Sequence, residues 1–207
     1  MEVWVRRATL CGLWALAANP AGAEEAFVVD AAASSFRISV GKSGLFSFAG
    51  HEHQVLATAI EGRIVVDREE AARSSVNLRF ETSGLKVEGQ GEPAEDVPKV
   101  QAKLASPEVL NVVQFPEVTF RSTAVEARQS PDGSWNLRVT GDVTIKGASR
   151  SLVLPLRVQL AEGVLTATGQ TVLKQREFGI TPVSVGGVVK VRNELGLDYK
   201  IVARVAP

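Results

Sequence analysis

The chain has 207 residues, of which 45% are hydrophobic and 22% are charged, and its 23 basic and 23 acidic residues balance. This composition is too apolar for a disordered chain, and the lack of a basic excess argues against nucleic acid as a partner. A single cysteine excludes a disulfide framework, and no apolar run reaches the roughly 18 residues of a transmembrane helix.

The start of the chain has the three parts of a secretory signal peptide in their usual order. Arg6 and Arg7 form a basic start, 8–18 is apolar, and 21–23 reads Ala-Gly-Ala, a small-x-small cleavage site. We therefore expect residues 1–23 to be removed on export, and 24–207 to form one domain.

Along most of the remaining chain, apolar residues alternate with polar ones, which is typical of strands with one buried face. In 135–146 the odd positions from Leu137 to Ile145 are apolar or glycine, and the even positions are polar. The same alternation predicts strands at 36–40, 60–66, 76–80, 118–125, 152–160, 164–172 and 199–205. With glycine-containing turns between them, these strands predict an all-β antiparallel barrel or sandwich of about eight or nine strands.

One connection between predicted strands breaks the alternation. Val97, Val100 and Leu104 have helical spacing, and Asp96 precedes them as a candidate N-cap. Ser106, followed by proline, has the pattern of a second helix start. We expect one or two short helices on this connection.

Residues that could carry catalysis are few. No cysteine follows the predicted cleavage site, and the motifs of serine hydrolases and nucleotide-binding folds are absent. His51 and His53 are the exception, because residues i and i+2 of a strand point to one side and can share a zinc or copper ion with a third ligand. The alternative is a pair of hydrogen-bonded polar side chains without a metal.

The barrel interior can be solid or hollow, because about eight strands enclose just enough space for side chains or for one small ligand. Small residues occur among the large ones on the apolar faces: Ser122, Ala124, Gly141, Ala167 and Gly169. They leave room for a ligand, or they interdigitate with large residues in a filled core. Trp135, the only tryptophan after the predicted cleavage site, lies beside a turn, so we expect it to be far from any channel.

Four segments in a fixed order share the pattern of a known family: 27–40, 112–120 with Gln-Phe-Pro-Glu-Val-Thr-Phe, 141–149 with Gly-Asp-Val-Thr-Ile-Lys-Gly-Ala-Ser, and 175–180 with Gln-Arg-Glu-Phe-Gly-Ile. Together they resemble the YceI-like domain family over about residues 27–205. The resemblance implies a lipocalin-like antiparallel β-barrel that is exported to the periplasm. It also implies that the barrel binds a long-chain isoprenoid lipid, polyprenyl or quinone-like, in an apolar channel without catalysis.

In such a barrel the apolar strand faces would form the channel wall. The candidate ligand-binding residues on these faces are Phe36, Ile38, Phe80, Phe120, Leu137, Val139, Leu154, Leu156, Phe178 and Tyr199. Arg176 lies near the barrel end by analogy with the family and is a candidate contact for a polar head group, or else a structural ion-pair partner. The segment from His51 to His53 departs from the plain Phe-x-Gly of many members, and histidines there are like those of a subset of the family.

Three hypotheses about function remain at this point. The first is a periplasmic carrier of an isoprenoid lipid, and the second is a metal-binding or metal-dependent stress-related protein that uses His51 and His53. The third is a solid barrel whose loops bind a partner protein, a membrane cytochrome being one option. The sequence leaves the oligomeric state open, with a homodimer as one possibility.

Overall fold

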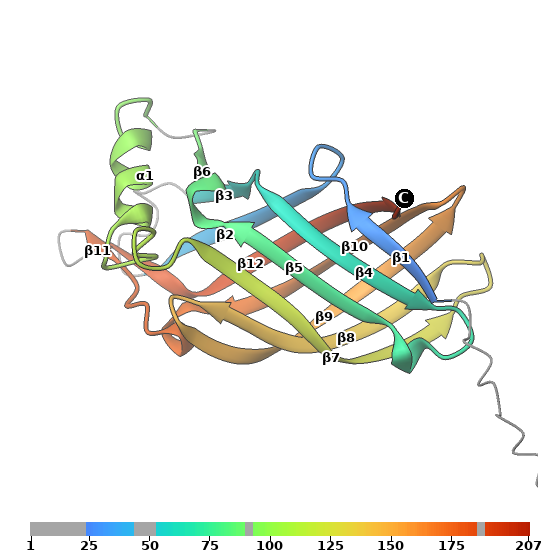
Figure 1. The fold of residues 1–207 in the computed structure, drawn as a ribbon. Coiled ribbons are helices and arrows are strands. Elements are labelled where there is room, and N and C mark those ends of the chain that lie inside the picture. Colours follow the sequence, from blue (N-terminus) through green and yellow to red (C-terminus); the bar gives the residue numbers. More distant parts are fainter. Residues whose placement is uncertain (1–23, 44–52, 90–92, 186–188) are drawn as a thin grey trace, which may run out of the picture.

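The computed structural model describes residues 24–43, 53–89, 93–185 and 189–207, and most of them belong to strands (Figure 1). The predicted signal peptide and His51 lie outside the described residues. The strands are β1 (Glu24–Val29), β2 (Ser35–Ser43), β3 (His53–Ala57), β4 (Ile60–Asp67), β5 (Ser75–Glu81), β6 (Leu85–Glu88), β7 (Glu117–Gln129), β8 (Trp135–Ile145), β9 (Ala148–Ala161), β10 (Val164–Lys174), β11 (Ser184–Val185) and β12 (Val189–Val205). The helical elements are α1 (Val97–Ala105) and the short 3₁₀ helices η2 (Ala71–Arg73), η3 (Thr82–Gly84) and η4 (Gln175–Phe178).

Eight of the described strands close a barrel. Neighbours around the ring follow the order β1-β4-β5-β7-β8-β9-β10-β12, and all pair antiparallel. The ring closes where β12 returns to β1, with Phe27 opposite Val205 and Val29 opposite Ala203. From β12 the sheet also continues through β2 and β3 to β6. The expected all-β antiparallel barrel is therefore confirmed.

The central strands have the burial pattern that their sequence predicts. In β8, Val139, Val143 and Ile145 are buried, whereas Asn136, Arg138 and Asp142, at positions of the opposite parity, are exposed. This period of two places one apolar face of the strand inside the barrel and one polar face in water.

Two tight hairpins fix the register of β8, β9 and β10. Lys146 and Gly147 join β8 to β9 with φ values of 50° and 76°, and Glu162 and Gly163 join β9 to β10 with 51° and 72°. Positive φ at both central residues is the signature of a type I′ turn, whose twist matches that of paired strands. Glycine at the second position makes this left-handed backbone accessible at little cost.

Helix α1 covers the free edge of β6. The Gln101 side chain accepts a hydrogen bond from the Val87 N–H (2.8 Å) and donates one to the Leu85 carbonyl (2.9 Å). It thus satisfies backbone groups that an edge strand leaves unpaired. Leu104 of the same helix packs against the barrel core.

The second helix predicted at Ser106 does not form in the described residues. The Ser106 hydroxyl donates to the Lys103 carbonyl (2.7 Å), so it satisfies the end of α1 instead of starting another helix. The chain then turns through Asn111, which has φ 50° and whose N–H donates to the Ser106 carbonyl (2.8 Å).

The expectation that Ala124 lies on the inner, apolar face of its strand was wrong, because β7 contains a bulge. Ser122 lies opposite Gly141 and Ala124 lies opposite Thr140, so Thr123 is an extra residue in the ladder. The extra residue reverses the alternation beyond it. Ala124 is therefore exposed and Val125 is buried.

Candidate functional site

One end of the barrel encloses a cavity of about 580 Å³. It lies at the end where β4 meets β5, β7 meets β8 and β9 meets β10, away from α1 (Figure 1). The volume is in the range of sites for small organic ligands. The barrel is therefore hollow over this part of its length.

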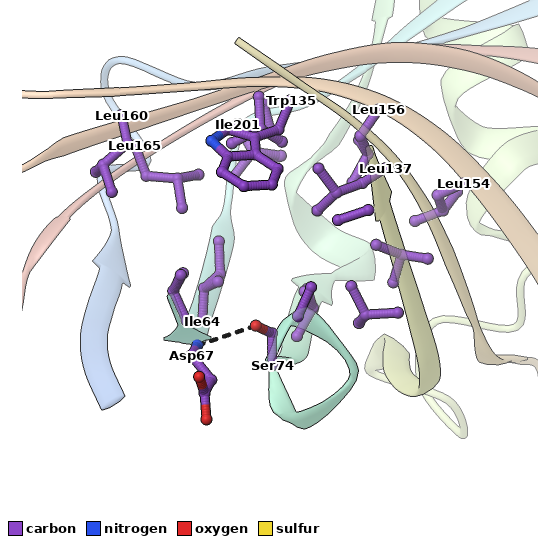
Figure 2. A pocket seen from close by; sticks show the side chains of 18 of the residues that line it. Ile64, Asp67, Ser74, Trp135, Leu137, Leu154, Leu156, Leu160, Leu165 and Ile201 are labelled. Atoms are coloured by element: carbon purple, nitrogen blue, oxygen red, sulfur yellow. Dashed lines mark hydrogen bonds between the residues drawn. The ribbon is translucent and has the colours of Figure 1, made fainter. Parts of the chain in front are cut away.

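The cavity wall is apolar. Figure 2 shows Leu154, Leu156 and Leu160 of β9 together with Trp135 and Leu137 of β8. Because alternate residues of a strand share one face, each strand contributes a row of side chains to the same surface. The other apolar lining residues are Phe36, Ile64, Val66, Ala71, Val76, Leu78, Val125, Ala127, Val139, Val158, Leu165, Ala167, Tyr199 and Ile201.

The rim of the cavity is polar and consists of the connection from β4 to β5. Asp67 is only 3% exposed, and its Oδ1 accepts hydrogen bonds from the N–H groups of Glu69 (2.9 Å) and Glu70 (2.7 Å). The Asp67 N–H in turn donates to the Ser74 hydroxyl (3.0 Å; Figure 2). The hydrogen bonds from Glu70 and Glu69 and the charge of Arg73 lower the pKa of Asp67.

Ion pairs hold the outer side of this rim. Arg68 contacts Glu25 at the start of β1 (2.5 Å), and Arg73 contacts Glu70 (2.7 Å). Since Arg68, Glu69 and Glu70 are exposed and also line the cavity, the cavity opens to solvent at this rim.

Two aromatic rings line the inner end of the cavity, away from the polar rim. Phe36 of β2 and Tyr199 of β12 lie directly opposite each other and stack at 5.7 Å between ring centroids. Phe36 also meets Phe80 edge-on at 4.9 Å. The Tyr199 hydroxyl donates to the Pro155 carbonyl (3.0 Å), and burial, with the charge of Asp198, raises the pKa of Tyr199.

Deeper in the barrel, side chains fill most of the interior, and a second pocket of about 310 Å³ lies between β9 and β10 near Leu152, Leu173 and Phe178. A methyl group at Gly141 would lie 2.5 Å from Cζ of Phe120, and one at Gly169 would lie 2.7 Å from Cε2 of Tyr199. These glycines therefore accommodate aromatic rings and leave no free space. The core continues with Val55, Leu85, Phe178, Ile180 and Leu197, all buried.

The structure divides the predicted binding residues between the two halves of the barrel. Phe36, Leu137, Val139, Leu154, Leu156 and Tyr199 line the cavity. Ile38, Phe80, Phe120 and Phe178 belong to the packed half. Arg176 is exposed in η4, where its N–H donates to the Asn193 side chain (3.0 Å), and lies at the end of the barrel opposite the polar rim.

Of the two predicted metal ligands, the structure describes only His53. His53 begins β3 opposite Val40 of β2, and His51 lies outside the described residues. Among the described residues, no group of three or more His, Cys, Asp or Glu side chains is placed to hold a metal.

The expectation for Trp135 was wrong. Trp135 lies in the cavity wall, since it is the first residue of β8 and shares a face with Leu137 and Val139. The alternation that predicted β8 already contained this information. The same signal along β9 would have added Val158 and Leu160 to Leu154 and Leu156.

A family model for the YceI-like domain matches residues 27–203. The chain belongs to the YceI-like domain family. In its fold, the YceI-like barrel resembles Burkholderia cenocepacia BcnA (18% identity, TM-score 0.64, covering 84% of this chain and 98% of that one). It also resembles a polyisoprenoid-binding domain from Saccharophagus degradans implicated in plant cell wall breakdown (10%, 0.64, 88% and 99%) and the Campylobacter jejuni YCEI protein (16%, 0.57, 74% and 85%).

These likenesses establish the lipocalin-like fold that the sequence motifs implied. A search of curated proteins found no match. In the part of the chain that the structure describes, no helix is both long and apolar enough to span a membrane.

Proposed function

We propose that this YceI-like protein is a periplasmic carrier that binds the apolar chain of an isoprenoid-type lipid and catalyses no reaction. The observation that carries the proposal is the apolar cavity of about 580 Å³, which opens at a polar rim. The polyisoprenoid-binding domain from Saccharophagus degradans, which has the same fold, supports the ligand class. The signal-peptide pattern of residues 1–23 supports export.

The hydrophobic effect supplies the binding energy. If a bound chain loses about 400 Å² of apolar surface, it gains about 10 kcal/mol. Association costs at least about 4 kcal/mol in translational and rotational freedom. The difference of about 6 kcal/mol corresponds to a Kd of about 10⁻⁵ to 10⁻⁴ M, weak enough for release.

The two ends of the cavity orient the ligand. Its apolar tail lies along the apolar side chains of β8 and β9 and points to the inner end of the cavity at Phe36 and Tyr199. Its head lies at the rim, beside Asp67 and the exposed Glu69 and Glu70. Three carboxylates and one guanidinium, that of Arg68, line this rim, so its net charge is negative and an uncharged head such as a hydroxyl or quinone fits better than a phosphate.

The chemistry of the lining supports a non-catalytic role. Tyr199 is the titratable group at the inner end of the cavity, and its hydroxyl donates to the Pro155 carbonyl. Its raised pKa keeps the phenol protonated, so it is a poor general acid and a poor general base at neutral pH. The other titratable residues of the lining, from Asp67 to Glu70, lie at the rim.

Native mass spectrometry of the protein purified from its host tests the proposal. We expect an excess mass of one lipid, which denaturation releases into an organic extract, on a polypeptide that begins at Glu24. Ala167→Phe fills the cavity and should abolish the excess mass. Thr168→Phe, on the exposed face of the same strand, is the matched control and should retain it.

Two results would contradict the proposal. One is a bare polypeptide mass that stays bare after incubation with prenyl alcohols and quinones. The other is equal lipid retention by Ala167→Phe and Thr168→Phe, which would place the lipid outside the cavity.

A further inference from the structure

We propose that the second pocket, in the barrel wall between β9 and β10, binds a small anionic amphiphile, that is, a carboxylate or phosphate attached to a short apolar group. The pocket has a volume of about 310 Å³. Among the described residues it shares no lining residue with the larger cavity, so it is a separate site. A ligand here is additional to the isoprenoid lipid and can be tested without it.

The pocket exists because β9 and β10 separate. Their ladder pairs 157–161 with 164–168 and ends there. β9 nevertheless stays paired with β8 as far as Ala148, and β10 stays paired with β12 as far as Lys174. Pro155 lacks the N–H that a ladder bond from this position would need. The two strands therefore diverge from Pro155 onward and leave a gap in the wall.

Side chains replace the ladder where the gap begins. The Tyr199 hydroxyl donates to the Pro155 carbonyl (3.0 Å), and the Thr171 hydroxyl donates to the Val153 carbonyl (3.2 Å). These two carbonyls of β9 are thus satisfied without a ladder to β10. The separation of the strands is therefore compatible with a stable fold, and the pocket follows it between 150–153 and 171–174.

Part of the pocket lining is apolar. Val143, Leu173 and Phe178 are buried, and Leu152 is half-buried. An apolar group that enters this part gains about 25 cal/mol for each Å² that it removes from water. The volume is at the lower end of the range of roughly 300 to 1,000 Å³ for ligand sites, so a short apolar group fits this pocket.

The exposed part of the lining is net positive. Arg150 and Lys174 line the pocket and are exposed, against one carboxylate, that of Glu177. In the part of the chain that the structure describes, neither cation forms an ion pair. Arg150 donates one hydrogen bond to the Ser149 carbonyl (2.7 Å), which leaves other N–H groups of its guanidinium for a ligand.

The two sites therefore differ in charge. Asp67, Glu69 and Glu70 make the rim of the larger cavity net negative, although Arg68 is among them. An anionic head is repelled there and attracted to Arg150 and Lys174. Arginine can also bind a carboxylate or phosphate through two parallel hydrogen bonds. The charge pattern thus directs anionic amphiphiles to the second pocket and uncharged ones to the larger cavity.

NMR titration of the delipidated protein tests this site residue by residue. The probes are octanoate, octyl phosphate and octanol, which share one chain and differ in the head. We expect the two anions to shift the amide signals of 150–153 and 171–174, with a Kd at least about fivefold lower than that of octanol at the same signals. The two anions together show whether a carboxylate or a phosphate is preferred.

Three variants test the charges. Arg150→Gln and Lys174→Gln should each weaken octanoate binding about two- to fivefold, and Glu177→Gln should strengthen it about twofold. Arg138→Gln is the matched control, because Arg138 is exposed on the neighbouring strand β8 and does not line the pocket; it should leave the Kd unchanged. All four side chains are exposed, so we expect each variant to keep the circular dichroism spectrum of the wild type.

Three results would overturn the site. The first is that neither anion shifts these amides, and the second is that octanol binds there as tightly as the anions. The third is that Arg138→Gln weakens binding as much as Arg150→Gln, which would indicate attraction to surface charge in general. Farnesol in the same experiment separates the two proposals, because it should shift the amide of Trp135 in the larger cavity. Either ligand can bind without the other, so one proposal can fail while the other stands.

Discussion

Substituting leucine for one small buried residue in each half of the barrel tests whether the barrel is hollow at only one end. Ala167 is 5% exposed and lines the cavity, whereas Ala57 is 7% exposed and belongs to the packed core. The two residues have the same side chain and nearly the same burial. They differ in whether empty space lies in front of the side chain.

The expected changes in unfolding free energy have opposite signs. At Ala167, leucine adds about three carbons at about 0.8 kcal/mol each. After a loss of about 0.5 to 1 kcal/mol in side-chain entropy, the protein gains about 1 to 2 kcal/mol. At Ala57 the same carbons overpack the core and cost about 1 to 3 kcal/mol.

Urea unfolding of the delipidated proteins, followed by circular dichroism, measures both changes. In thermal unfolding, 1 kcal/mol corresponds to about 2 to 4 °C for a domain of this size. Ala167→Leu should also weaken lipid binding, since it occupies the binding volume. If Ala167→Leu destabilises the protein as much as Ala57→Leu, the cavity is not empty space and the reasoning fails.

Three further predictions follow from individual residues. Trp135 lines the cavity, so its fluorescence should shift to the blue when a lipid displaces water; an unchanged spectrum under saturating lipid would contradict its placement. Gly141→Ala should destabilise the fold by about 1 to 3 kcal/mol in urea unfolding, because the new methyl group meets Phe120 at 2.5 Å. At Gly133, φ is 79° and an added methyl group would have no neighbour within 4 Å, so Gly133→Ala should cost only the left-handed backbone penalty of about 1 to 2 kcal/mol. A larger loss of stability for Gly133→Ala than for Gly141→Ala would contradict this reasoning. The folded-state pKa of Asp67 lies below the unfolded value of about 3.9, so its ionised form stabilises the fold above that pH and this contribution is lost as pH falls through the folded pKa. Asp67→Asn should therefore lower stability at neutral pH and flatten the loss below about pH 4, as measured by urea unfolding across pH.

Local patterns in the sequence predicted most of the fold. Alternation along β8 and glycine at Gly147 and Gly163 are local signals, and the strands and hairpins form where they indicate. The sequence wrongly predicted a second helix at Ser106, because a serine followed by proline is compatible with either the start or the end of a helix. Ser106 can begin a helix or end one, and the free carbonyl of Lys103 was the nearer partner.

The division of the barrel into a hollow and a filled half could not be read from the sequence. Gly141 and Ala167 look alike as small residues on apolar faces. One faces Phe120 from a neighbouring strand, and the other faces the cavity. Which of them leaves space depends on the register between β7 and β8, where the bulge at Thr123 shifts the pairing. That register is a property of the assembled sheet.

The lengths of the connections nevertheless explain which end is open. At the rim, β4 joins β5 through 68–74, β7 joins β8 through 130–134, and β9 joins β10 through Glu162-Gly163. The two shorter connections cannot fold over the barrel mouth, and the connection 68–74, which carries η2, lines the cavity at its rim. The connections that carry α1 and η4 are at the opposite end, where Leu104, Phe178 and Ile180 pack against the core. A ligand therefore has access from the end with short turns, and Trp135, placed beside one of them, is close to its path.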